Sequence, residues 1–216
     1  MLQPAEIERA LVVTAHPDDV DFGAAGTVAV LTDAGVSVTY CLVTDGDAGG
    51  SDRSMARSDM AALRRREQTN AAAAVGVTDL VFLGHGDGRV EASLQLRADI
   101  SRVIRAVRPT VVLCQSPERN LDRIYASHPD HLAAGHEPWA VSELWVMASG
   151  SPSASSPVDI TAQVDRKIAA LMCHESQLQD PERTAAMVRE WTRSTAAQFG
   201  LADGIAAEAF RVVDTR

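Results

Sequence analysis

The feature that most constrains the fold of this chain is a regular alternation of short apolar runs with longer helical segments. Five runs are rich in β-branched residues and apolar at almost every position, as in strands covered on both faces. They span residues 10–15, 36–43, 79–84, 110–115 and 143–148. Helical stretches lie between them, over residues 24–34, 58–75 and 94–107. This alternation predicts an α/β fold with a mainly parallel sheet and right-handed crossovers.

The length and charge of the chain narrow its class. The 216 residues, 46% of them hydrophobic, can bury a sizeable core, and we expect a single domain over residues 1–216. A formal net charge of -9 argues against a nucleic-acid partner or an anionic membrane surface. No apolar run approaches the roughly 20 residues that a membrane span needs. The protein is therefore expected to act on a small molecule.

The N-terminus and the cysteines give an expectation for the compartment. The first residues show no basic segment followed by an apolar one, so we expect no signal peptide. Three cysteines without metal-like spacing indicate reduced thiols in a cytoplasmic protein. Cys41 and Cys114 lie inside strand-like runs and are expected to pack in the core.

Polar clusters follow four of the predicted strands directly. In an open parallel sheet, ligands bind beyond the carboxyl ends of the strands, where such clusters converge. Loops are commonly polar, and that explanation is sufficient for any one cluster. Four clusters that include two "HPD" triplets favour a site instead. The clusters span residues 16–19, 44–50, 84–89 and 116–131.

The two triplets, "HPDD" (16–19) and "HPDH" (128–131), combine imidazole with carboxylate, the ligand set of zinc and similar ions. An open catalytic zinc site takes three protein ligands and leaves a position for water. His16, Asp19 and His131 would supply such a set. The alternative is that the histidines merely begin helices and the aspartates cap them, although capping requires no histidine.

These motifs, in this order, resemble the PIG-L/LmbE-like de-N-acetylases, the N-acetylglucosaminyl-phosphatidylinositol deacetylase superfamily. The resemblance includes "AHPDD", "TDGDAGG" and "HPDH" at three strand ends. It extends to an R-x-x-E helix beginning at Arg64, an Asp-Gly segment in "LGHGDGRVE", and an H-x-S-Q motif at 174–177. It implies a Rossmann-like three-layer sandwich and hydrolysis of N-acetyl groups, commonly from glucosamine conjugates. The implied cofactor is Zn²⁺, with another divalent ion such as Fe²⁺ as the alternative.

The resemblance also implies catalytic roles for single residues. Asp18 becomes the general base, and His128 becomes the acid or oxyanion stabiliser, with Asp130 orienting its ring. The metal ligands are the three residues named above. Amide hydrolysis needs such groups, because water is a poor nucleophile and an amine is a poor leaving group. A positioned acid or base is typically worth ~10²–10⁴-fold in rate.

The predicted substrate is an amino-sugar conjugate. The loops carry many hydrogen-bonding side chains and the chain is only 4% aromatic, which favours a polyhydroxylated molecule over a nucleobase or an acyl chain. Arg64, at the R-x-x-E position, together with Asp47 and Asp87, is predicted to bind it. The alternative for Arg64 is that it forms a solvated helix face with Arg65 and Arg66, as runs of charge usually do.

Other functions stay open at this point. A related amidase could cut a thiol conjugate or an acylated antibiotic, and a non-catalytic module could bind sugar or metal. A nucleotide-binding protein is disfavoured, because no G-x-G-x-x-G follows the first strand. The interval 132–142 barely suffices for a parallel crossover, which indicates either a shortened lid or residues absent from this stretch.

Three further features carry expectations. His85 is expected to be a solvated loop histidine. His174, in the H-x-S-Q motif, is expected either at the rim of the cleft or in a buried structural pair. The amphipathic segment around Trp191 is expected to contribute to the core or to contacts in a homo-oligomer.

Overall fold

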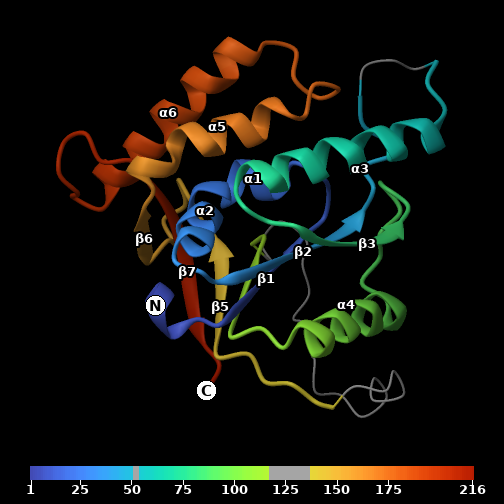
Figure 1. The fold of residues 1–216 in the computed structure, drawn as a ribbon, viewed down its shortest axis with the longest axis horizontal. Coiled ribbons are helices and arrows are strands. Elements are labelled where there is room, and N and C mark those ends of the chain that lie inside the picture. Colours follow the sequence, from blue (N-terminus) through green and yellow to red (C-terminus); the bar gives the residue numbers. More distant parts are fainter. Residues whose placement is uncertain (51–53, 117–136) are drawn as a thin grey trace.

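The computed structural model describes residues 1–50, 54–116 and 137–216 (Figure 1). Within these residues the strands form one seven-stranded sheet of order β3-β2-β1-β4-β5-β7-β6. The strands are β1 (Arg9–Thr14), β2 (Ser37–Thr44), β3 (Asp79–His85), β4 (Val111–Cys114), β5 (Glu143–Met147), β6 (Ser156–Asp159) and β7 (Ala207–Asp214).

The first five strands are parallel, as the sequence predicts. β1 lies between β2 and β4, and β2 pairs with β3 while β4 pairs with β5. The strand order reverses at β1, so the crevice beyond the ends of β1 and β4 is a topological switch point. The "HPDD" turn directly follows β1 and therefore lies at this crevice.

The last two strands, β6 and β7, were not predicted. Both run antiparallel, β7 against β5 and β6 against β7. β7 carries Glu208 and Arg211 among its apolar residues, so it lacks the continuous apolar run that identifies a central parallel strand.

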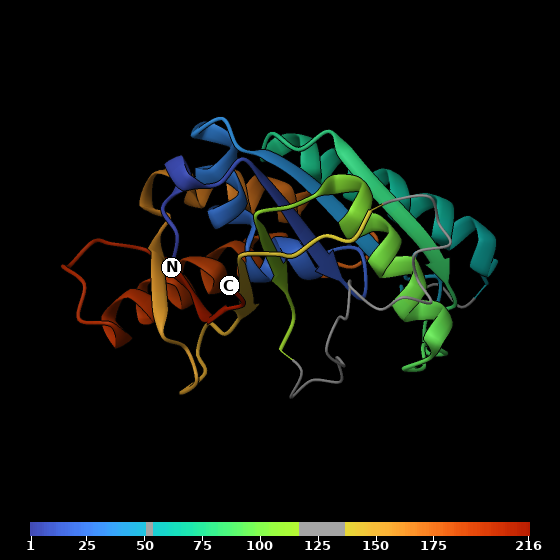
Figure 2. The same ribbon diagram turned by 90° about the horizontal axis from the view of Figure 1, so that it is seen from below.

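Helices cover both faces of the sheet unequally (Figures 1 and 2). α1, α2, α3 and α5 contribute to the core on one face, whereas α4 packs against the other, and α6 lies against α5 and β7. β1 serves both cores, because Ala10 and Val12 point to the first face and Leu11 and Val13 to the second. The helices are α1 (Asp19–Gly23), α2 (Ala25–Asp33), α3 (Arg57–Ala74), α4 (Leu94–Val107), α5 (Val164–Met172) and α6 (Pro181–Gln198), with 3-10 turns at Pro4–Glu6 and Thr161–Gln163.

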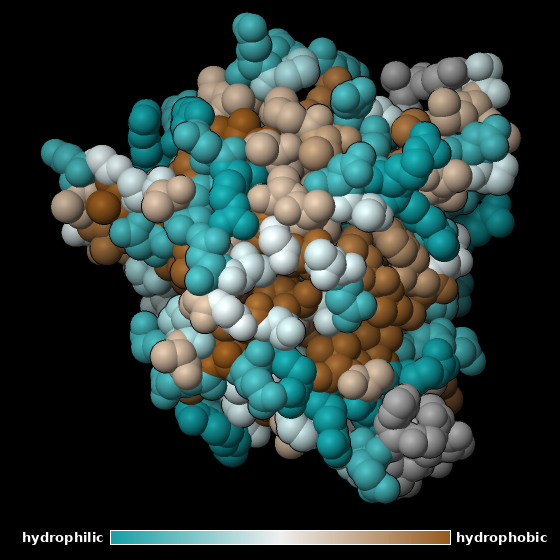
Figure 3. All heavy atoms as spheres, viewed as in Figure 1, coloured by the Kyte–Doolittle hydropathy of each residue, from teal (hydrophilic) through white to brown (hydrophobic). Residues whose placement is uncertain are grey.

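On the face seen in Figure 3, hydrophilic residues cover much of the outline, and the most extended hydrophobic area lies near the centre. β3 forms an edge of the sheet, and the apolar residues along it are only partly buried. Among the described residues, no helix is long and apolar enough to cross a membrane.

Candidate active site

The "HPDD" turn is held in the crevice by the strands on either side of it. The amide of Ala15 donates to Gln115 Oε1 (2.9 Å), just beyond β4, and the amide of Thr44, at the end of β2, donates to the Ala15 carbonyl (2.9 Å). The backbone then turns sharply at Asp18, whose φ of 85° lies in the left-handed region that aspartate tolerates better than most residues. Asp18 thereby occupies the position before α1, which begins at Asp19.

His16 lies between two carboxylates. Its Nδ1 is 3.3 Å from Asp19 Oδ2, and its Nε2 is 2.9 Å from Asp87 Oδ1, on the loop after β3. The hydrogen bond with Asp19 is the main cause that raises the pKa of His16 to about 9, against the opposing effect of burial. Two carboxylates around one imidazole make this position favourable for a cation. The donor set of nitrogen and oxygen also suits zinc.

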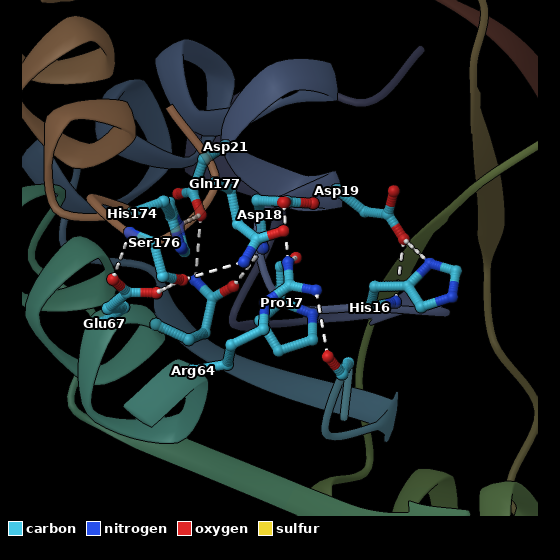
Figure 4. A network of polar contacts seen from close by, with 12 residues as sticks. His16, Pro17, Asp18, Asp19, Asp21, Arg64, Glu67, His174, Ser176 and Gln177 are labelled. Carbon is cyan, nitrogen blue, oxygen red and sulfur yellow. Dashed lines mark hydrogen bonds and ion pairs between the residues drawn. The ribbon is translucent and has the colours of Figure 1, made fainter. Parts of the chain in front are cut away.

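Asp18 and Asp19 are neighbours in sequence but have different partners (Figure 4). Asp19 accepts the backbone N–H of His16 (2.7 Å), whereas Asp18 Oδ2 accepts from Arg64 Nη2 (2.7 Å). The Asp18 side chain makes no N-cap hydrogen bond, so the capping alternative does not describe it. Burial raises the pKa of Asp18 to about 6, and the Arg64 charge opposes that rise.

Arg64 is a buried arginine, 3% exposed, on α3. Besides Asp18, it donates to the carbonyls of Pro17 (2.6 Å) and Gly46 (3.4 Å). A Cβ added at Gly46, where φ is +63°, would overlap Arg64 Nη1. The structure therefore gives Arg64 a role that the sequence did not predict, the orientation of Asp18. Its predicted contact with substrate stays a prediction.

A buried chain of hydrogen bonds extends from Asp18 to the H-x-S-Q motif. The backbone N–H of Asp18 donates to Gln68 Oε1 (2.8 Å), and Gln68 Nε2 donates to Asp21 Oδ2 (2.9 Å). The same Asp21 oxygen is 2.8 Å from His174 Nε2. Asp21 and His174 are both buried, at 0% and 1% exposure, which decides the open question about His174 in favour of a buried pair.

The rest of the H-x-S-Q motif is hydrogen-bonded to α3, the helix that carries Arg64 and Gln68. Ser176 donates its backbone N–H and its hydroxyl to the two carboxylate oxygens of Glu67, at 2.8 and 2.7 Å. Gln177 then accepts from the backbone N–H of Gly50 (3.3 Å), in the loop after β2. The motifs that the sequence separates by about a hundred residues are thus joined in one network.

The other predicted substrate residues also have protein partners. Asp47 accepts from Arg57 Nε (2.6 Å) and from the backbone N–H of Asp87 (2.9 Å), which links the loops after β2 and β3. The Arg57 hydrogen bond lowers the pKa of Asp47. The contacts of Asp87 with His16 and with this loop place both aspartates beside the metal ligands that the sequence predicts. Their role toward substrate stays a prediction.

Three predicted site residues, His128, Asp130 and His131, lie outside the described residues. Within the described ranges no group of three His, Cys, Asp or Glu side chains could hold a metal ion, so His16 and Asp19 form a pair rather than a complete site.

His85 differs from its prediction. It is not a solvated loop histidine: it ends β3 with its Nε2 3.2 Å from Asp99 Oδ2, and its side chain is only 25% exposed. Gln68 is a further residue of the network around Asp18 that the sequence did not predict. Its spacing of four from Arg64 places both side chains on one face of α3, and that spacing was the available signal.

This chain is similar to several proteins that are named as deacetylases. The family model described as "PIG-L: GlcNAc-PI de-N-acetylase" matches residues 11–142, more than half of the chain. A diacetylchitobiose deacetylase from Thermococcus kodakarensis is 29% identical over 92% of this chain and 80% of its own length. A Bacillus cereus protein described as "Probable N-acetyl-alpha-D-glucosaminyl L-malate deacetylase 2" is 37% identical over 58% of this chain and 56% of its own.

The fold also agrees with a solved structure. The N,N'-diacetylchitobiose deacetylase from Pyrococcus horikoshii, complexed with its inhibitor MPG, superposes with a TM-score of 0.83 at 27% identity. The match covers 98% of this chain and 85% of that one.

Proposed function

This chain belongs to the PIG-L family of GlcNAc-PI de-N-acetylases, and from that membership we propose that it hydrolyses the N-acetyl group of an N-acetylglucosamine conjugate. The relatives described above are named as deacetylases of such compounds, which supports N-deacetylation as the reaction. The observation that carries the proposal is that two adjacent carboxylates have different partners: Asp19 contacts His16, and Asp18 contacts Arg64.

A divalent metal, zinc in our proposal, would be held by His16, Asp19 and His131. Imidazole and carboxylate ligands fit that ion, and the two carboxylates around His16 favour positive charge at this position. When bound, zinc would supply a Lewis acid for the acetyl carbonyl and lower the pKa of a water molecule to about 7.

The protein groups would move the proton. Asp18, held by Arg64 through its carboxylate and by Gln68 through its backbone, would accept a proton from water and pass it to the departing nitrogen. His128, oriented by Asp130, would stabilise the oxyanion, although both residues lie outside the described ranges. Arg64, Asp47 and Asp87 are proposed to border the sugar.

The test is a set of N-acetylglucosamine conjugates assayed for free amine and free acetate. We expect equal amounts of both products from at least one of diacetylchitobiose, N-acetylglucosaminyl malate and N-acetylglucosaminyl inositol. A chelator should abolish release, and added zinc should restore it. An Asp18→Asn preparation, purified in parallel, controls for contaminating deacetylases.

Two results would contradict the proposal. Release that survives complete removal of metal would exclude the metal-dependent route. Binding of these conjugates without any release by zinc-loaded protein would favour the non-catalytic binding module.

A further inference from the structure

A cavity of about 420 Å³ is lined in part by Asp19. Its walls come from α1, the ends of β4 and β5, the start of β7, and the α5 and α6 helices. Phe22, Met147 and Trp191 supply apolar surface, and Ser149, Ser151 and Ser153 supply hydroxyls. The volume lies in the range of small-molecule sites, roughly 300–1,000 Å³. Because Asp19 is a predicted metal ligand, the cavity would begin where the acetylated sugar would be held.

One wall of the cavity carries an unusually exposed tryptophan, Trp191. Trp191 lies on α6 and 55% of its surface is exposed, although tryptophan is normally well buried. An exposed indole at the rim of a cavity offers a flat apolar face and an N–H donor to a ligand. A sugar ring presents a matching apolar face of C–H groups, with hydroxyls around its edge.

The serine wall can serve those hydroxyls. Ser149 Oγ accepts the backbone N–H of Ala209 (2.9 Å), and the Oγ atoms of Ser151 and Ser153 are 2.8 Å apart. A hydroxyl provides one donor and two acceptor positions, so each serine retains capacity for a further hydrogen bond.

Among the described lining residues, the cavity offers no free cation to an acidic ligand. Lys167 is the one cation among the described lining residues, and its three N–H bonds go to the carbonyls of Asp21 and Phe22 and to Glu208 Oε1, at 2.9, 2.6 and 2.7 Å. The carboxylates of Asp19 and Glu208 also line the cavity. The described lining residues therefore leave no free cation to pair with a ligand carboxylate.

From these walls we infer that the cavity binds the second part of the substrate, and that this part is a neutral polyhydroxylated ring stacked on Trp191. The inference rests on the proposed function, and it selects neutral glycosides such as disaccharides over conjugates with an acidic aglycone such as malate.

The first experiment compares kcat/KM for diacetylchitobiose, N-acetylglucosaminyl malate and free N-acetylglucosamine. We expect wild-type protein to prefer the disaccharide to the malate conjugate by about tenfold or more. Trp191→Ala should lower the ratio of disaccharide to monosaccharide activity about 3- to 10-fold, the size of an aromatic contact. Leu94→Ala, which truncates a 75% exposed leucine on the opposite face of the sheet, should leave that ratio unchanged.

A gain-of-function variant tests the charge argument. Ser153→Lys places a free cation in the cavity wall and should raise activity on the malate conjugate relative to the disaccharide. A wild-type preference for malate, or an unchanged ratio in both Trp191→Ala and Ser153→Lys, would overturn the inference.

A binding measurement separates this inference from the proposed function. Isothermal titration calorimetry should detect binding of diacetylchitobiose to Asp18→Asn protein, and the additional substitution Trp191→Ala should weaken that binding. Binding at Trp191 without deacetylation by the wild-type protein would reject the proposed function alone. Deacetylation by the wild-type protein, together with equal affinity for the disaccharide in Asp18→Asn with and without Trp191→Ala, would reject the cavity assignment alone.

Discussion

Arg64 joins three parts of the site at the scale of a single residue. Its guanidinium contacts the Asp18 carboxylate, the carbonyl of the turn at Pro17 and the carbonyl of Gly46. The close approach of the Gly46 backbone leaves no room for a side chain there. The geometry of the proposed base therefore depends on a glycine in a different loop.

Gly46→Ala tests this dependence. We expect a loss of stability of about 1–2 kcal/mol from the left-handed backbone, and in addition a lower kcat because the guanidinium must move. Gly35→Ala is the matched control, since Gly35 also has a positive φ of +84° but nothing within 4 Å of its added Cβ. Thermal unfolding and steady-state kinetics on both variants give the comparison. Equal kcat in the two would show that Arg64 tolerates displacement.

At the scale of elements, the junction between α1 and α2 is held by a buried ion pair. Lys167, on α5, donates to the carbonyls of Asp21 and Phe22 in α1. Glu208, on β7, accepts the backbone N–H groups of Gly26 and Thr27 at the start of α2. The two side chains also bind each other at 2.7 Å, each 2% exposed. The pair thus anchors the helix that carries Asp19.

Lys167→Met should lower the free energy of unfolding by about 3–5 kcal/mol, because it leaves Glu208 buried without its cation. Arg189→Ala, which breaks an exposed pair with Asp165, should cost about 0–1 kcal/mol. Urea unfolding of both variants measures the difference. A cost for Lys167→Met no larger than that for Arg189→Ala would contradict the anchoring role.

The second element-scale relation is the docking of the H-x-S-Q segment on α3. Gln68 connects the two, because its amide accepts from the Asp18 backbone and donates to Asp21 beside His174. We therefore regard Gln68 as a positioning residue that fixes the strained backbone of Asp18.

Gln68→Met keeps the volume of the side chain and removes both hydrogen bonds. We expect kcat per folded molecule to fall on the order of 10- to 100-fold, with KM and metal content nearly unchanged, because the base is misplaced while the ligands remain. The stability cost should be about 1–3 kcal/mol. Asn70→Ala, exposed on the same helix, is the control. A variant that loses stability but keeps the wild-type kcat would show a purely structural role.

For the whole molecule, the sequence predicts the five parallel strands β1 to β5, because buried parallel strands carry continuous apolar runs. It does not reveal β7, whose charged Glu208 is explained only by partners on α2 and α5. The polar residues after β1 could likewise be placed at the crevice, since strand ends meet there. The contact of Gln68 with Asp18 could not be predicted from the sequence, because it depends on how α3 lies across the turn.

The burial of the three cysteines predicts their reactivity. Cys41 and Cys114 are buried, and burial raises the pKa of each thiol to about 12, whereas Cys173 is only partly covered. In the native protein at pH 8, we expect a thiol reagent to label Cys173 first and the other two only on unfolding. Mass spectrometry of the labelled peptides identifies the sites. Rapid native labelling of Cys41 or Cys114 would contradict the core.

The most direct test of the central claim is to measure zinc content and kcat together in Asp18→Asn and Asp19→Asn. In our proposal the two adjacent carboxylates have different roles: Asp19 binds the metal and Asp18 transfers the proton. We predict that Asp18→Asn keeps its zinc and loses ~10²–10⁴-fold in kcat on an N-acetylglucosamine conjugate, since asparagine tolerates the same backbone. Asp19→Asn should instead lose most of its zinc. Loss of zinc from Asp18→Asn with retention in Asp19→Asn would contradict the account.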